Sequence, residues 1–184
     1  MKPDFERGLV KMDAIFTRTS VRSYEERPVE AEKIEKILRA AMAAPSAVNQ
    51  QPWEFYVVTN KAVLQELSET SPYTAMTAKA PAALVLCSRK ENIIVPELIE
   101  VDMALATENI LLEIEAQGLG GVMLGVAPFA DRMEKVAKAI NLPEHLVPFT
   151  VVPFGYPAKK NLQQDRYDEA RVHYVRLIPP MPAL

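Results

Sequence analysis

Two short segments of the chain carry side chains whose types and spacing could hold a ligand with a charged end and a flat end. The first is Arg18-Thr19-Ser20-Val21-Arg22, which places two guanidinium groups and two hydroxyls within five residues. A guanidinium offers a phosphate two parallel hydrogen bonds, and a hydroxyl adds a neutral donor. The segment predicts a phosphate site, and the alternative is a solvated basic turn.

The second segment is Ala44-Pro45-Ser46-Ala47-Val48-Asn49-Gln50-Gln51-Pro52-Trp53. Its polar side chains, next to Pro and Trp, suit a flat ring edged with heteroatoms. Three amide side chains between two prolines are unusual for a plain turn. The alternative is a helix stop followed by a turn. For Trp53 packing in the core is the favoured interpretation, because a tryptophan that begins a strand usually packs inward.

The elements that must position these segments follow from hydrophobic periodicity. In the predicted helix Glu30–Ala44, apolar residues recur at helical spacing, and Pro45 ends it because the residue before a proline is pushed out of the helical region. The other predicted helices are Met12–Arg18, Lys61–Glu69, Pro96–Gln117 and Asp131–Ile140, and the predicted strands are Glu54–Thr59, Ala82–Ser88, Gly121–Val126 and Val147–Phe154. This mixed order predicts an α+β fold.

Two further regions point to contacts beyond a single helix or strand. The predicted helix Pro96–Gln117 is apolar around much of its circumference, so it is either buried centrally or packed against a partner chain. The tail Ala158–Leu184 is polar and ends in prolines, with one β-like patch at Val172–Ile178. A tail of this kind is either disordered or laid across another surface.

Composition excludes several classes of protein. The 184 residues predict one domain over 1–184, and the net charge of −3 gives no indication of nucleic acid or membrane as a partner. The N-terminal residues have no apolar core of a secretory signal, so the cytoplasm is the expected location. The lone cysteine, Cys87, allows no intramolecular disulfide, fits a reducing compartment, and is predicted to be a buried, inert thiol.

Other motifs with chemical potential carry weaker signals. The glycines between Gly118 and Gly125 do not form a dinucleotide fingerprint, because they follow a helix and enter a strand. They cap a helix or allow close packing, or else Gly125 lets a ligand approach the backbone. His145 and His173 are too scattered to predict a metal site, and no nucleophile elbow supports a hydrolase.

Taken in chain order, these features resemble the nitroreductase / FMN-dependent flavin reductase family. The resemblance runs from about Met12 to Arg176 and rests on Arg18–Arg22, Ala44–Trp53, the Asn109–Gly125 passage, Gly155-Tyr156-Pro157-Ala158 and Arg166. It implies a mostly antiparallel β-sheet flanked by helices, as a three-layer sandwich, in an intertwined homodimer. Two FMN sites would lie at the subunit interface, and the tail 158–184 would pack on the partner subunit.

The resemblance also implies roles for individual residues. Arg18, Ser20 and Arg166 would hold the FMN phosphate, with the Thr19 backbone nearby. Arg22 would reach the pyrimidine edge of the flavin and act as the catalytic residue. The remaining implied contacts are Pro45, Ser46 and Ala47 of the other subunit against the ring, Asn49 on the flavin or ribityl chain, and the Leu124 and Gly125 amides facing N5 and O4.

The implied activity is transfer of electrons from NADH or NADPH, through flavin N5, to a nitroaromatic, a quinone or a similar flat acceptor. Departures from the family pattern are a short Ser88–Asp102 stretch and no tryptophan after Arg176, so the open face of the flavin is expected to be unusually exposed. Two alternatives stay open: a flavin-binding carrier or sensor without robust turnover, and a non-flavin scaffold that matches by chance.

Overall fold

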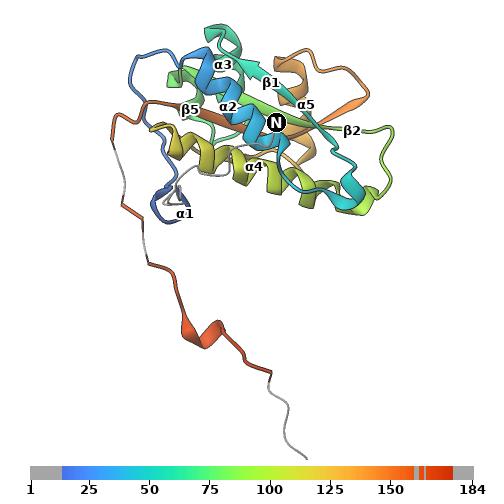
Figure 1. Ribbon diagram of the computed structural model, residues 1–184. Coiled ribbons are helices and arrows are strands. Elements are labelled where there is room, and N and C mark those ends of the chain that lie inside the picture. Colours follow the sequence, from blue (N-terminus) through green and yellow to red (C-terminus); the bar gives the residue numbers. More distant parts are fainter. Residues whose placement is uncertain (1–13, 160–161, 164, 176–184) are drawn as a thin grey trace, which may run out of the picture.

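A five-stranded antiparallel sheet lies between two layers of helices (Figure 1). The computed structural model describes residues 14–159, 162–163 and 165–175. The strands are β1 (Trp53–Val58), β2 (Ala82–Arg89), β3 (Gly120–Gly121), β4 (Leu124–Gly125) and β5 (Leu146–Gly155). They run in the order β1-β2-β5-β3, and β4 also pairs with β5. The predicted α+β class and the antiparallel sandwich are confirmed.

The helices occupy the predicted places. They are α1 (Ala14–Thr17), α2 (Ala31–Met42), α3 (Lys61–Ser68), α4 (Ile99–Ala116) and α5 (Ala130–Ala139), with short 3-10 helices η1 (Ala47–Asn49), η2 (Ala75–Lys79), η3 (Pro96–Leu98) and η4 (Glu169–Arg171). Pro96 therefore opens a 3-10 turn that leads into α4, rather than α4 itself. The first two residues of the predicted helix Met12–Arg18 lie outside the described residues, and η1 and η2 were not predicted.

The two faces of the sheet carry two cores. Along β2, alternate side chains point to opposite faces, so that Leu84 and Leu86 pack toward α2 and α4, while Val85 and Cys87 pack toward α3 and α5. Trp53, only 7% exposed, joins the α2/α4 core, which confirms it as a core residue. Cys87 is fully buried, and burial raises the pKa of its thiol to about 12, in agreement with an inert side chain.

The prediction of one continuous strand over Gly121–Val126 is wrong, because the segment forms two separate two-residue strands, β3 and β4. The pairs Gly121–Phe154 and Leu124–Val151 keep one register on β5, so Val122 faces Pro153 between them. Val122 N donates to Pro153 O at 3.3 Å, but proline has no N–H to return that hydrogen bond. The ladder is interrupted there.

The tail leaves the domain after a short contact with the segment that follows α1. Tyr24 and Pro157 form an isolated antiparallel bridge, and Ala158 N donates to Ser23 O at 3.1 Å. Beyond it, the described residues that include η4 extend away from the sheet and helices (Figure 1). Residues 172–175, the described part of the β-like patch, do not form a strand, because a strand needs a neighbour to receive its backbone hydrogen bonds.

Candidate functional site

The segment Arg18–Arg22 is held by its backbone, which leaves its arginine side chains on the surface. Val21 N donates to Gly121 O at 3.0 Å, and Ser20 forms a parallel bridge with Gly121. A side chain on Gly120 would put its Cβ 2.7 Å from the Val21 Cβ, so only glycine permits this approach. The buried Tyr24 hydroxyl donates to Val21 O at 2.8 Å and to Pro153 O at 3.0 Å.

A polar cavity of about 410 Å³ opens beside this segment. The side chains around it are polar or cationic except for one leucine, and they are Arg18, Thr19, Ser20, Arg22, Leu162, Gln163 and Arg166. Three of them carry guanidinium groups and none carries a carboxylate. Arg18 Nε lies 3.5 Å from Glu108 Oε1, and a partly exposed pair at this distance is weak. The polar cavity is therefore suited to a multiply charged anion such as a phosphate.

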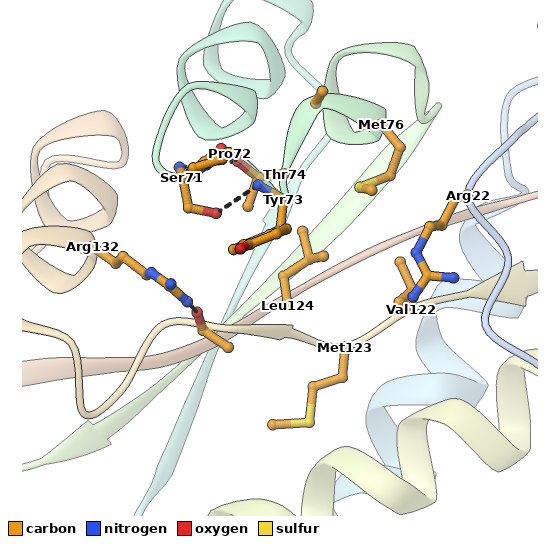
Figure 2. Close-up of a pocket in the computed structure, with 12 residues that line it drawn as sticks. Arg22, Ser71, Pro72, Tyr73, Thr74, Met76, Val122, Met123, Leu124 and Arg132 are labelled. Carbon is orange, nitrogen blue, oxygen red and sulfur yellow. Dashed lines mark hydrogen bonds between the residues drawn. The ribbon is translucent and has the colours of Figure 1, made fainter.

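A second hollow, here called the ring cavity, has a volume of about 480 Å³ and shares Arg22 with the polar cavity. Its other walls are residues 71–76, residues 122–125 and Arg132, so that Met76, Val122 and Met123 give it an apolar surface (Figure 2). Two neighbouring cavities, one cationic and one largely apolar, are joined at one arginine. This arrangement fits a ligand that has an anionic end and a flat end.

Gly125 lies on the wall of the ring cavity with open space in front of it. A Cβ built there would meet no protein atom within 4 Å. Among the described glycines, Gly118 has a positive φ and Gly125 does not. Neither packing nor backbone conformation thus requires glycine at this position. The remaining reason for a glycine is on the cavity side, where a flat ligand could approach the backbone closely.

The loop that follows α2 is strained and tightly held. Val48, Asn49 and Gln51 have φ values of 44°, 57° and 45°, in the left-handed region that non-glycine residues seldom adopt. The carboxylate of Asp102, which is 2% exposed, accepts hydrogen bonds from Ala47 N at 2.9 Å and Gln50 Nε2 at 2.7 Å. A buried carboxylate with two donors fixes both ends of the turn.

Further contacts close the loop onto β2 and onto the segment before α4. Arg89 Nη2 donates to Gln50 O at 3.1 Å and to Gln51 O at 2.9 Å. The side-chain oxygen of Gln50 accepts from Ile94 N and Val95 N. Gln50, predicted as part of a polar ligand-facing loop, is instead 6% exposed and structural.

The predicted site residues fall into two groups in this chain. Those that line the two cavities are Arg18, Thr19, Ser20, Arg22, Leu124, Gly125 and Arg166. Pro45, Ser46, Ala47 and Asn49 line neither cavity. Within the loop, Ser46 Oγ accepts from Gln51 N at 3.0 Å, and Asn49 Oδ1 accepts from Gln51 Nε2 at 2.9 Å. The second group is pre-formed, but away from the cavities of its own chain.

Sequence reasoning missed Asp102, Arg89, Arg132 and residues 71–76. A signal existed for Asp102, which stands at i, i+4 and i+8 spacing with the buried Ala106 and Ile110, so that a lone carboxylate falls on the inner face of an apolar helix. Residues 71–76 read as an ordinary polar loop and carry no such signal. Among the described residues no three histidine, cysteine or acidic side chains gather as metal ligands.

In the part of the chain that the structure describes, no helix is both long and apolar enough to cross a bilayer.

Comparisons with known proteins agree on one family. The Nitroreductase family model matches residues 15–93 and 70–156. A Methanothermobacter thermautotrophicus protein, provisionally named NADH dehydrogenase/NAD(P)H nitroreductase, is 43% identical over 162 residues, which cover 88% of this chain and 85% of that protein.

Solved structures give the same result. The crystal structure of a Clostridium acetobutylicum protein, provisionally named NADH oxidase, is 44% identical with a TM-score of 0.86 and covers 90% of this chain and 100% of that one. A Desulfovibrio desulfuricans protein, provisionally named a nitroreductase and solved in complex with FMN, is 25% identical with a TM-score of 0.76 and covers 91% of this chain and 97% of that one. This chain belongs to the nitroreductase family.

Proposed function

We propose that this protein is an FMN-dependent NAD(P)H oxidoreductase that reduces nitroaromatics, quinones or similar flat acceptors. The observation that carries the proposal is the pairing of the cationic polar cavity with the apolar ring cavity through Arg22. FMN has a phosphate at one end and a flat ring system at the other. The FMN complex of the Desulfovibrio desulfuricans relative and the NAD(P)H in the name of the Methanothermobacter relative support the same assignment.

The polar cavity holds the phosphate in this proposal. Arg18 and Arg166 contribute guanidinium forks, and Ser20 and the Thr19 backbone complete the set of groups around the anion. The bound flavin supplies the capacity to accept a hydride at N5 and pass it on. The chain supplies position and charge. The amides of Leu124 and Gly125 orient the N5 and O4 edge, where Gly125 leaves room for close approach.

Arg22 has a separate task because it borders both cavities. Its positive charge would lie toward the pyrimidine edge of a bound flavin, where negative charge near N1 and O2 grows on reduction. Coulomb attraction in a partly dry site then favours the reduced state over the oxidised one.

The partner is a second copy of this chain. Leu98 of η3 and Val101 and Leu105 of α4 are 40%, 52% and 40% exposed, and on the adjacent α1, Phe16 is 76% exposed. Large apolar side chains that are exposed side by side on one surface are typical of an interface. In the resulting homodimer, Pro45, Ser46, Ala47 and Asn49 of one subunit cover the flavin held by the other. A single domain over 1–184, in the cytoplasm, completes the proposal.

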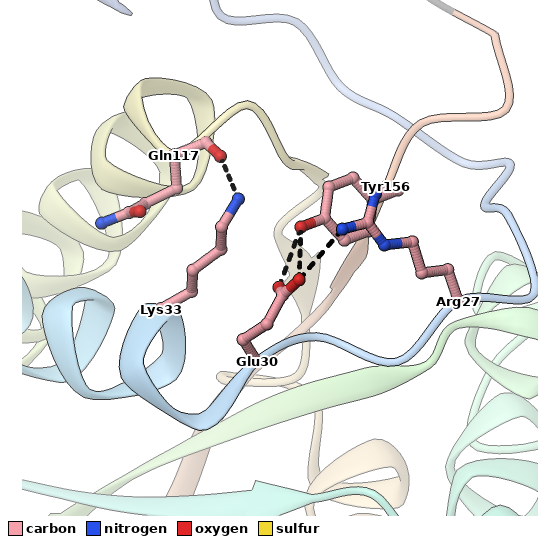
Figure 3. A network of polar contacts seen from close by, with 5 residues as sticks. All are labelled: Arg27, Glu30, Lys33, Gln117 and Tyr156. Atoms are coloured by element: carbon pink, nitrogen blue, oxygen red, sulfur yellow. Dashed lines mark hydrogen bonds and ion pairs between the residues drawn. The ribbon is translucent and has the colours of Figure 1, made fainter.

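The tail packs on the partner in this arrangement, and its direction of departure is set by a polar network (Figure 3). The Tyr156 hydroxyl donates to both Glu30 carboxylate oxygens, at 3.0 and 2.8 Å. Arg27 lies 3.8 Å above the Tyr156 ring, and Lys33 lies 4.9 Å from it. Past this anchor, Tyr167 and Tyr174 are 74% and 75% exposed. Large aromatic side chains in an extended segment favour docking onto another surface.

Gly125→Val tests the cofactor assignment. A Cβ at this position meets no neighbouring atom within 4 Å, so we expect the melting temperature of the FMN-free protein to stay unchanged while FMN affinity falls by about 10-fold or more. Gly120→Ala is the contrasting variant, since it clashes with Val21 and lowers the melting temperature itself. Full FMN affinity in Gly125→Val contradicts the proposal.

Turnover separates the oxidoreductase from a carrier or sensor. Anaerobic stopped-flow mixing of the FMN-loaded protein with NADH and with NADPH is expected to bleach the flavin within the time scale of turnover, and a nitroaromatic or quinone restores its colour. Flavin that stays oxidised with both nucleotides favours the carrier or sensor.

A further inference from the structure

Arg132 brings a second cation to the ring cavity, from the side opposite Arg22 (Figure 2). It stands in the first turn of α5 and is half-buried. Its Nη1 donates to Gly125 O at 2.9 Å. Its guanidinium lies 4.0 Å above the Phe129 ring and 6.0 Å from that of Tyr73. These three contacts hold the guanidinium plane in place beside the cavity.

The charge around Arg132 is not balanced within the described part of the chain. The residues that line the ring cavity include two guanidinium groups and no carboxylate. Arg132 takes part in none of the ion pairs found among the described residues. One of the five N–H donors of an arginine is used on Gly125 O, which leaves most of its fork for a ligand. A held, unpaired guanidinium beside exposed aromatic rings matches a flat ligand with an anionic substituent.

We propose that Arg132, with Tyr73 and Phe129, forms an anion-recognition subsite at the outer end of the ring cavity. The inference rests on the proposed function, in which the flavin occupies the inner part next to Arg22. The ligand class is an aromatic or nucleotide ligand that carries a carboxylate or phosphate. Two sources have this chemistry, a carboxylate on the electron acceptor and the 2′-phosphate of NADPH.

The test compares ligands of equal shape and different charge. Benzoate and benzamide are titrated calorimetrically into the full-length, FMN-saturated protein at low salt. Benzoate is expected to bind at least about 10-fold more tightly, and Arg132→Gln is expected to remove this preference while leaving benzamide unchanged. Glutamine keeps a donor for Gly125 O. Arg39→Gln is the matched control, because Arg39 lies on α2 paired with Glu35, outside both cavities.

A second arm identifies the source of the anion. In Arg132→Gln, loss of affinity for NADPH relative to NADH assigns the subsite to the nucleotide, and loss confined to benzoate assigns it to the acceptor. No charge preference in the wild type, or equal losses for benzoate and benzamide, overturns the subsite. A loss of FMN affinity beyond about 2-fold in Arg132→Gln also overturns it, because Arg132 is then a flavin ligand.

Failure of the proposed function gives a different result. In that case the wild-type protein takes up no FMN, or its flavin is not reduced by NADH or NADPH, whatever residue stands at 132.

Discussion

The cavities around Arg22 and the loop after α2 are built in opposite ways. The residues that line the cavities are not among those with a positive φ, and the side chains of Arg22 and Arg166 are exposed. In the loop, three residues adopt left-handed conformations, and the buried Asp102 holds them. In the proposed site, the cavities form the cationic half, whose arginines would gain their interactions only when an anion binds. The loop half has its shape before any ligand or partner binds, at the cost of local strain.

The largest effect is expected in the cationic half. Arg18→Ala removes a bidentate contact to the phosphate, which costs about 2–3 kcal/mol, or roughly 30- to 150-fold in FMN affinity. Arg166→Ala acts in the same direction but more weakly, because this side chain comes from the exposed tail. Both are measured by FMN titration of the apoprotein. Unchanged affinity in both variants means that the phosphate binds elsewhere.

In the loop half the first effect is on stability. Asp102→Asn replaces a buried charge that accepts from Ala47 N and Gln50 Nε2, and loss of hydrogen bonds to a charged group costs about 1.5–3 kcal/mol. We expect a lower midpoint in urea for the apoprotein and a smaller loss of FMN affinity than in Arg18→Ala. Glu100→Gln, an exposed position on the same helix, is the control. Equal urea midpoints for both variants would show that the Asp102 carboxylate is not needed to hold the strained loop after α2.

Mixing subunits decides whether the two halves meet across the dimer. A heterodimer of Arg18→Ala and Asp102→Asn subunits has one site with both defects and one with neither, if each site uses the cationic half of one subunit and the loop of the other. One tight FMN per dimer is then expected in a titration of the separated heterodimer. If both halves of a site come from one chain, each site carries one of the two defects and neither site binds FMN with wild-type affinity.

Assembly gives an independent test of the same arrangement. Deleting Ala158–Leu184 removes Arg166 together with the segment assigned to the partner, so we expect weaker dimers and lost flavin together. The full chain is expected to stay dimeric at micromolar concentration in analytical ultracentrifugation. A full-length monomer that still binds FMN tightly contradicts the shared site.

A finer effect separates Arg22 from the other arginines of the cationic half. If its charge favours the reduced ring, Arg22→Ala lowers the midpoint potential of the bound flavin, and a differential loss of ~1.4 kcal/mol corresponds to about 30 mV for a two-electron couple. Hydride transfer from NADH slows as well. Spectroelectrochemical titration of the FMN-saturated variant measures the shift, and an unshifted midpoint leaves Arg22 as a phosphate ligand alone.

The smallest effect is expected for the reactivity of Cys87, in the β-sheet that supports both the cavities and the loop after α2. Burial raises the pKa of the Cys87 thiol to about 12, so the native thiol stays protonated and does not react with iodoacetamide at pH 8, with or without FMN. Because this pKa lies above that of an unfolded cysteine, about 8.5, the stability it contributes is complete below pH 8.5 and declines as the pH rises toward 12. Alkylation of the FMN-free protein alone, seen by mass spectrometry, would show that the sheet opens.

The resemblance of several motifs in chain order identified the family, and local patterns in the sequence predicted most of the helices and strands and the burial of Trp53 and Cys87. Helical periodicity and proline positions act within one or two turns, so they are readable without a fold. The sequence also placed Arg18, Ser20 and Arg22 in one short segment, and the family resemblance named Arg166 and Gly125, which line the same two cavities in the structure.

Only the tertiary structure decided how the loop after α2 is held and how the sheet is divided. Asp102 meets Ala47 N from 55 residues away, and Arg89 reaches Gln51 O from 38 residues away. The break between β3 and β4 depends on Pro153 of β5. The position of the Arg132 guanidinium depends on its contacts with Gly125 and Phe129. A buried charge such as Asp102, or a missing N–H such as that of Pro153, affects only the groups that the fold brings within hydrogen-bonding distance. Because that distance is not related to spacing along the sequence, these effects could not be predicted from the sequence.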